Sequence, residues 1–153
     1  MDTPFFGFEQ DFVGSLRCIP MVVRHHLDTC GVKLKLEHWN HFSQEQRQSL
    51  VDWPCDTPLA AKAYGEQLQQ MIIEQTGYPA KTLDIAPTPP WQQTEVIPET
   101  VAQKFEEQQV SLTVAQWARL DELQRFALVK LSRPSHENLN FIPAVKEFGL
   151  YDQ

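Results

Sequence analysis

An internal repeat limits how this chain can fold. Residues 19–51 align with residues 97–129 without a gap, at a constant offset of 78 positions. Ten of the aligned pairs are identical, where average composition gives about two. They are Ile19/Ile97, Pro20/Pro98, Val23/Val101, Val32/Val110, Leu34/Leu112, Trp39/Trp117, Gln46/Gln124, Arg47/Arg125, Leu50/Leu128 and Val51/Val129. A self-match of this length predicts two halves built on the same scaffold.

Helix-capping patterns recur in both halves. A Ser, Thr or Asp followed three residues later by Gln predicts a capping box at a helix N-terminus. The pattern occurs at Ser43 with Gln46, Thr113 with Gln116, and Asp121 with Gln124. The first and last predict helices that run to about Trp53 and Leu131. The middle one predicts a short helix that carries Trp117, with Trp39 on its equivalent in the first half.

The strongest single helix prediction covers residues 58–76. Thr57 suits the N-cap, Pro58 the first helical position and Gly77 the C-terminal stop. Further helices are expected over about residues 8–16, 20–28, 98–107 and 143–148. Alternating strand-like residues come only in runs of three, which is too few for a sheet. The sequence therefore predicts an all-α fold.

A proline-rich linker, residues 77–98, joins the two halves. It holds five of the chain's 11 prolines, so we expect it to be extended and non-helical. Trp91 indicates that the linker packs along the surface. Each half has only about 75 residues, so both are expected to share one core. The predicted organisation is one all-α domain over residues 1–153, with repeats at 19–76 and 97–148.

Charge and composition disfavour several kinds of partner. The net charge is −7, which repels nucleic-acid backbones and anionic membranes. No apolar stretch approaches the roughly 20 residues that span a bilayer, and the first residues lack the basic region of a signal peptide. Three cysteines without close spacing indicate reduced thiols. We expect a cytoplasmic protein that binds neither nucleic acid nor membrane, and the sequence gives no oligomeric state.

The repeat also separates structural residues from functional candidates. An identical position in both halves is expected to serve packing, whereas a polar residue in only one half is a better functional candidate. Trp39 and Trp117 are therefore predicted to lie in the core. Arg47 and Arg125 are predicted to bind a carboxylate or helix-terminal carbonyl groups. The candidate acidic partners are Asp52 and Asp121.

Polar residues without counterparts gather in the first half. The candidates for binding a partner or an anion are Arg17, Cys18, Arg24, His25 and His26. Positive charge and a helix N-terminus beside Cys18 would lower its thiol pKa and make it reactive. The commoner alternative is a buried cysteine that packs as a small hydrophobe.

Catalytic and metal-binding patterns are weak. His38 and His41 have a spacing that can bind a metal, and Cys55 or Cys30 would complete the site, but no CxxC or HExxH pattern supports it. There is no GxSxG motif, no Gly-rich phosphate loop and no distinctive carboxylate pair. We expect no enzyme activity, no catalytic residue, no cofactor and no metal, with His38, His41 and Cys55 as weak metal candidates.

Four motifs near the N-terminus resemble a known family. They are FxFExDF at residues 6–12, SLRCIPM at 15–21, LD with GVKLxL at 27–36 and WxxFS at 39–43, followed by Pro54-Cys55 and Tyr64. Together they resemble the N-terminal signature of the nitrate reductase-associated protein family of cyanobacteria. The resemblance is specific over the first 70 residues and looser beyond.

The resemblance implies a small soluble protein whose genes lie beside those for nitrate reductase and molybdenum-cofactor synthesis. It further implies a requirement for active nitrate reductase, in assembly or cofactor loading. It supplies no catalytic residue. It makes Arg17, Cys18 and Pro20 candidates for the interaction surface.

Three functional hypotheses follow. The leading one is a non-catalytic accessory protein that binds nitrate reductase during maturation. The second is a module for a molybdopterin-type cofactor, held by Arg17, Arg24, His25 and His26. The third is a metal- or thiol-dependent enzyme that uses His38, His41 and a cysteine.

Overall fold

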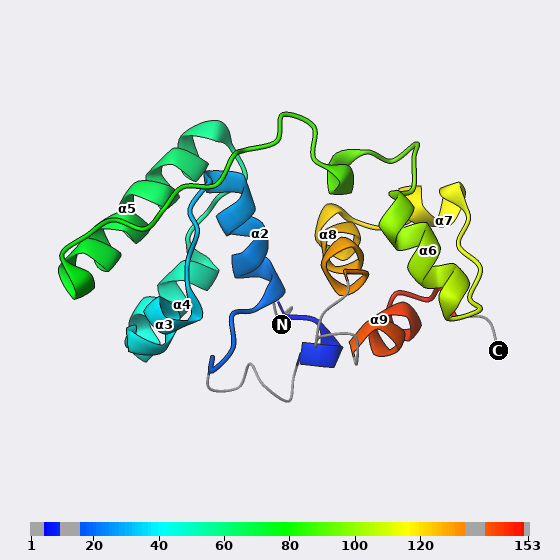
Figure 1. Ribbon diagram of the computed structural model, residues 1–153, viewed down its shortest axis with the longest axis horizontal. Helices are drawn as coiled ribbons and strands as arrows, with labels where there is room; N and C mark the ends of the chain where they lie inside the picture. Colours follow the sequence, from blue (N-terminus) through cyan, green and yellow to red (C-terminus); the bar gives the residue numbers. More distant parts are fainter. Residues whose placement is uncertain (1–4, 10–15, 134–139, 152–153) are drawn as a thin grey trace. The chain divides into compact units, whose positions relative to one another are not determined.

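The regular structure of this chain is helical wherever the computed structural model describes it, which is residues 5–9, 16–133 and 140–151 (Figure 1). The α-helices are α2 (Met21–Cys30), α3 (Leu36–His41), α4 (Gln44–Asp52), α5 (Pro58–Thr76), α6 (Glu99–Glu107), α7 (Val114–Arg119), α8 (Glu122–Leu131) and α9 (Phe141–Glu147). Two 3-10 helices are η1 (Gly7–Glu9) and η2 (Pro90–Gln92). In these ranges the one β-type pairing is an isolated bridge between Val32 and Thr82. The predicted all-α fold is confirmed.

The chain divides into two compact units. Unit 1 comprises Met1–Phe5 and Glu9–Ile85, and unit 2 comprises Phe6–Phe8 and Ala86–Gln153. The boundary after Ile85 falls inside the predicted linker. A single domain with one shared core stays a prediction.

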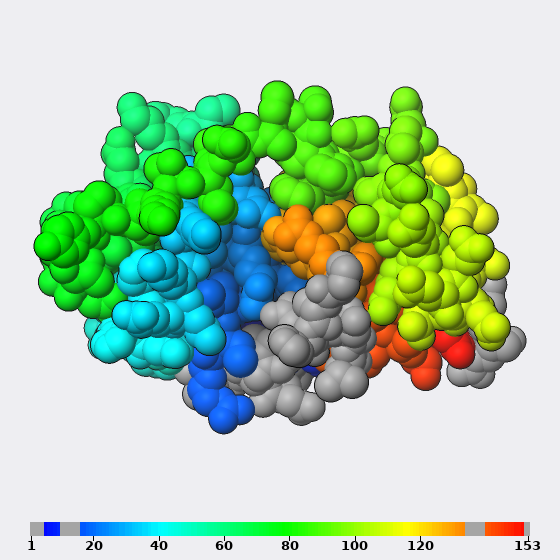
Figure 2. All heavy atoms as spheres, in the orientation of Figure 1, coloured from blue at the N-terminus to red at the C-terminus, as the bar shows by residue number. Residues whose placement is uncertain are grey.

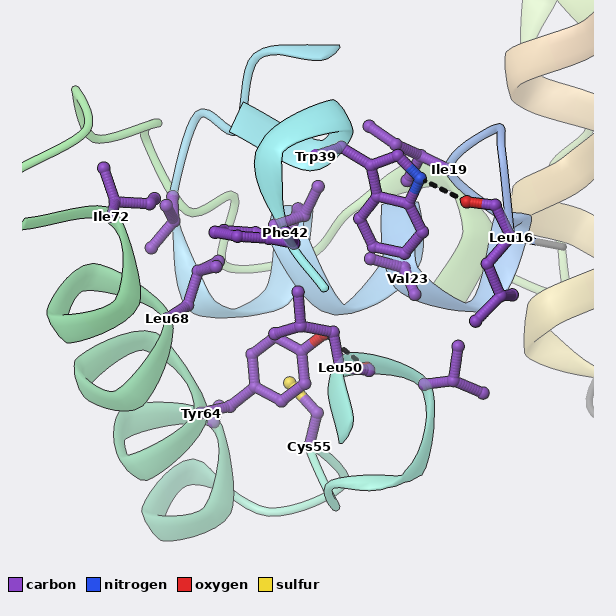
Figure 3. Packing of buried hydrophobic residues seen from close by; sticks show 14 residues of the cluster. Leu16, Ile19, Val23, Trp39, Phe42, Leu50, Cys55, Tyr64, Leu68 and Ile72 are labelled. Atoms are coloured by element: carbon purple, nitrogen blue, oxygen red, sulfur yellow. Dashed lines mark hydrogen bonds between the residues drawn. The ribbon is translucent and has the colours of Figure 1, made fainter. Parts of the chain in front are cut away.

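Unit 1 is built around α2, which packs against α4 and α5. Its core includes Trp39 from α3, Leu50 from α4 and Leu68 from α5, none of which is exposed (Figure 3). Helix α5 begins and ends as predicted. The Thr57 hydroxyl accepts from the Ala60 amide, and Gly77 ends the helix in the left-handed conformation.

Unit 2 is built around α8, which packs against η2, α6 and α9. Its aromatic residues meet edge to face. The Trp91 and Phe126 ring centroids are 4.9 Å apart, and those of Phe105 and Phe141 are 5.1 Å apart. Such pairs add to the stabilisation that burial of their area provides. Trp117 is fully buried, as is Trp39, so the predicted core role of both is confirmed.

All three predicted capping boxes form. In each, the hydroxyl or carboxylate of the cap accepts from the amide three residues on, and the Gln side chain accepts from the amide of the cap; they are Ser43/Gln46, Thr113/Gln116 and Asp121/Gln124. Three helices on each side of the linker also begin at matching positions. The starts of α2, α3 and α4 precede those of α6, α7 and α8 by 78 residues.

The linker prediction needs one correction. Residues 77–98 are not wholly non-helical, because η2 forms at Pro90–Gln92, where proline occupies the first helical position without losing a bond. Trp91 is buried there, which agrees with the prediction that the linker packs against the protein. Before it, the linker runs back beside α5 (Figure 1), since the Gln69 amide both accepts from and donates to the backbone of Ala80.

Two predicted helix boundaries also differ. The helix expected over residues 8–16 lies largely outside the described residues, and Gly7–Glu9 forms a 3-10 helix instead. Helix α9 begins at Phe141, two residues before the predicted Pro143, because proline is tolerated in a first helical turn.

The N-terminal segment of unit 2 is bound to α9. The carboxylate of Glu147 accepts from the amides of Gly7 and Phe8, both at 2.9 Å. The rings of Phe6 and Phe8 stack at 5.3 Å, and both lie edge to face against Phe148. Unit 2 thus joins segments that lie 140 residues apart in the sequence.

Two glycines with positive φ give a matched test of packing. A Cβ at Gly31 (φ 77°) would lie 2.9 Å from Ile85 Cγ1 and 3.0 Å from the Leu83 carbonyl oxygen, whereas one at Gly77 (φ 84°) would meet nothing within 4 Å. We expect Gly77→Ala to lower the free energy of unfolding by about 1 kcal/mol, from backbone strain alone. Gly31→Ala should cost about 1–3 kcal/mol more. Urea unfolding of both variants measures the difference, and equal losses would contradict the predicted clash.

Candidate functional site

The segment that leads into α2, residues 16–20, places two polar side chains on the surface between buried neighbours. We call it the approach segment. Arg17 and Cys18 are exposed, while Leu16 and Ile19 are 2% and 8% exposed. In Figure 2 this segment protrudes at the lower edge of unit 1. Arg17 and Cys18 are therefore exposed between two fixed points, which we call anchors: the backbone carbonyl of Leu16 and the start of α2.

The first anchor is the backbone carbonyl of Leu16. It accepts from the Trp39 indole N–H at 2.8 Å (Figure 3). It also accepts from the Arg47 guanidinium at 3.2 Å. Arg47 also donates to the carbonyls of Trp39 and Asn40 at the end of α3. The predicted role of Arg47 in binding helix-terminal carbonyls is confirmed. These dipoles stabilise the guanidinium charge, while Asp52 instead accepts from Gln48.

Leu16 has an unusual backbone conformation. Its φ of 54° lies in the left-handed region, which costs a non-glycine residue on the order of 1–2 kcal/mol. Such strain persists where the surrounding structure enforces it. Here the two hydrogen bonds to the carbonyl and the buried side chain hold Leu16 in place.

The second anchor lies at the start of α2. Pro20 precedes this helix and offers no side-chain acceptor, and the carboxylate of Glu9 fills the role by accepting from the Met21 amide at 2.8 Å. Glu9 is only 1% exposed. A carboxylate at a helix N-terminus is favoured by the helix dipole. Glu9 is not among the residues predicted from the sequence, although a single Glu among the phenylalanines of the first motif is a signal.

Unit 2 has a related anchor without the exposed Arg-Cys pair. The Trp117 indole N–H donates to the Gln93 carbonyl at 2.7 Å. Arg125 donates to the carbonyls of Trp91 and Leu120, which confirms its predicted structural role, and Asp121 serves as an N-cap instead. Gln93 has an extended backbone, with φ −90° and ψ 113°.

The predicted binding residues do not all come together. Arg24 Nε donates to the Ile19 carbonyl at 3.2 Å, so its guanidinium lies at the approach segment with Arg17 and Cys18. The predicted burial of Cys18 is wrong, because an anchored turn exposes it. His25 is partly exposed on α2.

His26 turns toward the core instead. Its Nδ1 lies 3.4 Å from the Leu50 carbonyl, and its ring meets the Tyr64 ring edge to face at 4.9 Å. Tyr64 donates to that same carbonyl at 2.6 Å. Burial lowers the pKa of His26, so its neutral form is favoured. His26 is thus a packing residue rather than part of a cationic surface.

The weak metal candidates have structural partners. His38 Nδ1 accepts from the Lys35 amide, the role that Gln116 performs for Thr113 in unit 2. Partial burial, with Lys35 nearby, lowers the pKa of His38. Nδ1 of His41 lies 2.8 Å from the Glu37 carbonyl. Within the described ranges, no three His, Cys, Asp or Glu residues form a group that could hold a metal ion.

The two inner cysteines are in protonating environments. Burial raises the pKa of Cys30 to about 11 and that of Cys55 to about 12. Cys55 Sγ lies 3.7 Å from the His26 carbonyl and Cys30 Sγ lies 3.8 Å from the Leu27 carbonyl. Both thiols pack as small apolar groups.

Comparison with protein families assigns the chain. Residues 5–148 match the model of the conserved nitrate reductase-associated protein family. The chain belongs to this family. The match includes the approach segment, Glu9, and both tryptophan–arginine pairs. No curated protein and no solved structure matches the chain. Among the helices described for this nitrate reductase-associated protein, none is both long and apolar enough to cross a bilayer.

Thiol labelling will test the contrast between the cysteines. Because burial raises the pKa of Cys30 to about 11 and that of Cys55 to about 12, both thiols are mostly protonated at pH 8 and should react slowly. We expect one fast-reacting thiol per native chain and three in denaturant. Cys18→Ser should abolish the fast phase, and the matched control Cys30→Ser should keep it. A fast phase that survives in Cys18→Ser would contradict the assignment.

The buried imidazole predicts a pH dependence of stability. The pKa of His26 is lower in the folded state than its ordinary value of about 6.5, which applies to the unfolded state. Below pH 6.5 the unfolded state therefore binds more protons than the folded state. The contribution of His26 is therefore complete above pH 6.5 and is lost as the pH falls through the lowered pKa. His26→Gln should give a smaller decline in unfolding free energy from pH 7 to 5. His41→Gln is the exposed control, and identical pH profiles for the two variants would refute the prediction.

Proposed function

We propose that this chain is a non-catalytic accessory protein that binds nitrate reductase during its assembly or molybdenum-cofactor loading. The family match over residues 5–148 supports an association with nitrate reductase. The observation that carries the proposal is the approach segment, in which buried anchors hold Arg17 and Cys18 exposed. A rigid, exposed polar pair suits recognition of a protein surface, because little conformational freedom is lost on binding.

A binding role also agrees with the surroundings of the chemically reactive side chains. His26 and His38 have backbone partners and lowered pKa values, and Cys30 and Cys55 have raised ones. These residues favour neutral forms that support packing. We therefore propose that the chain acts by binding and that it works in the cytoplasm with reduced thiols.

The cofactor-binding alternative keeps part of its original support. Arg24 lies at the approach segment, so this part of the surface carries two arginines. His26 is withdrawn toward Tyr64 and Leu50. Fewer cationic residues gather at the approach segment than the sequence predicts, which favours a protein partner over a bound molybdopterin.

We also infer that the two units descend from one duplicated unit. Helices α2, α3 and α4 start 78 residues before α6, α7 and α8. The left-handed residue after the first helix follows the same offset, at Gly31 and Gln109. Two shared core tryptophans donate to carbonyls that precede these helices. Retention of these features alongside different surfaces supports a scaffold role for the repeat.

Binding to purified reductase will test the function. We expect the chain to bind nitrate reductase purified without its molybdenum cofactor more tightly than the loaded enzyme. Arg17→Ala should weaken that binding about tenfold, since an exposed Arg is a typical interface anchor. Glu95→Ala, at the paired position in unit 2, should leave binding unchanged. Affinity is measured by surface immobilisation of the reductase.

Two outcomes would decide against this proposal. Absence of binding to the reductase in either cofactor state would exclude the accessory role. Calorimetric binding of the isolated cofactor, lost in a variant with Arg17→Ala and Arg24→Ala, would favour the cofactor-binding module instead.

A further inference from the structure

We infer that the approach segment, which is one residue shorter than the equivalent connection in unit 2, holds Arg17 in a fixed position. This position allows Arg17 to contact a carboxylate-bearing surface of the partner. The inference rests on the proposed function and names the contact and the residues that position it. Arg17 is the contact residue. Trp39 and Arg47 are positioning residues that act through Leu16.

The connection from the tryptophan-bound carbonyl to the next helix differs in length between the two units. In each unit a core tryptophan donates to a backbone carbonyl ahead of the next helix, at Leu16 and at Gln93. Helix α2 starts five residues after Leu16, and α6 starts six residues after Gln93. The same connection is therefore made with one residue fewer in unit 1.

The residue that begins each connection also has a different backbone conformation in the two units. Leu16 has φ 54°, in the left-handed region, whereas Gln93 is extended with φ −90°. A left-handed residue reverses the chain direction sharply, so the segment turns within fewer residues. The shortened connection thus coincides with the strained residue that immediately precedes Arg17.

Hydrogen bonds fix both ends of the approach segment. The Leu16 carbonyl accepts from Trp39 and Arg47, the Ile19 carbonyl accepts from Arg24, and the Met21 amide donates to Glu9. Only two residues lie between the first two of these fixed carbonyls. The backbone of Arg17 and Cys18 is therefore held before any partner binds, which reduces the entropy lost on association.

Arg17 places a positive charge on the surface of an acidic chain. Arg17 is exposed and forms no ion pair with any residue in the described ranges, and the chain as a whole carries a net charge of −7. An arginine on an acidic protein meets its complement on a partner in a carboxylate group, with which it forms paired hydrogen bonds. In unit 2 the residues between Gln93 and Ile97 are Thr94, Glu95 and Val96, none of which carries a positive charge.

An insertion will test the inference in the full chain. One Ala inserted between Arg17 and Cys18 gives unit 1 the spacing found in unit 2 and keeps every side chain. We expect the midpoint of thermal unfolding to be retained or raised, because Leu16 can leave the left-handed region. Affinity for the cofactor-free reductase should fall about tenfold or more. The matched control is an Ala inserted between Glu95 and Val96, which should leave affinity unchanged.

A second variant avoids any dependence on how the insertion folds. Arg47→Lys removes the fork that holds Leu16, and Arg125→Lys makes the same change in unit 2. We expect Arg47→Lys alone to weaken reductase binding, and to alter the rate at which Cys18 is alkylated. In the wild type, the contribution of Arg17 to affinity should fall as salt rises, and Arg17→Gln should make the salt dependence shallower.

The outcomes separate this inference from the function on which it rests. If the wild type binds and the insertion and Arg47→Lys variants, both folded, bind equally well, the positioning role is overturned while the accessory function stands. If Arg17→Gln leaves the salt dependence unchanged, the carboxylate contact is overturned. If the wild type does not bind the reductase at all, both proposals fail.

Discussion

The hydrogen bond from the Trp39 indole to the Leu16 carbonyl joins the core of unit 1 to its candidate site. Trp39 is fully buried, so its N–H must find a partner inside the protein, and the carbonyl it finds belongs to the residue before Arg17. Arg47 reinforces the same carbonyl and lies 5.7 Å from the centre of the Trp39 ring. Packing in the core and presentation of the surface pair therefore depend on one interaction. A change that loosens the indole also loosens Arg17.

Sequence alone predicts the elements that depend on neighbouring residues. The capping boxes and both ends of α5 follow from side chains within three or four positions of the groups they satisfy. It fails where the partner is distant in sequence. Glu9 caps α2 from 12 residues away, and η2 forms in a segment that proline content marks as extended. The burial of Trp91 against Phe126 stabilises that turn, and no local pattern reveals it.

The candidate site is predictable to a similar extent. The exposure of Arg17 and its place beside α2 agree with the contrast between the two halves, because the unit 2 segment lacks both the charge and the thiol. The same contrast misleads at His38, which differs from Gln116 in kind but performs the same backbone capping. It misleads again at His26, whose ring faces Tyr64. A difference in sequence between copies thus marks a new function only where the side chain is also free of a structural task.

The contact between Glu147 and the amides of Gly7 and Phe8 has a consequence for biosynthesis. These partners are separated by 140 and 139 residues, so Gly7 and Phe8 leave the ribosome long before Glu147. The residues of unit 1 from Glu9 to Ile85 are all synthesised before α9 exists. Phe6 and Phe8 are therefore synthesised long before Phe148, the ring that both of them contact. The contact can therefore form only after α9 has left the ribosome, when all of unit 1 has already been synthesised.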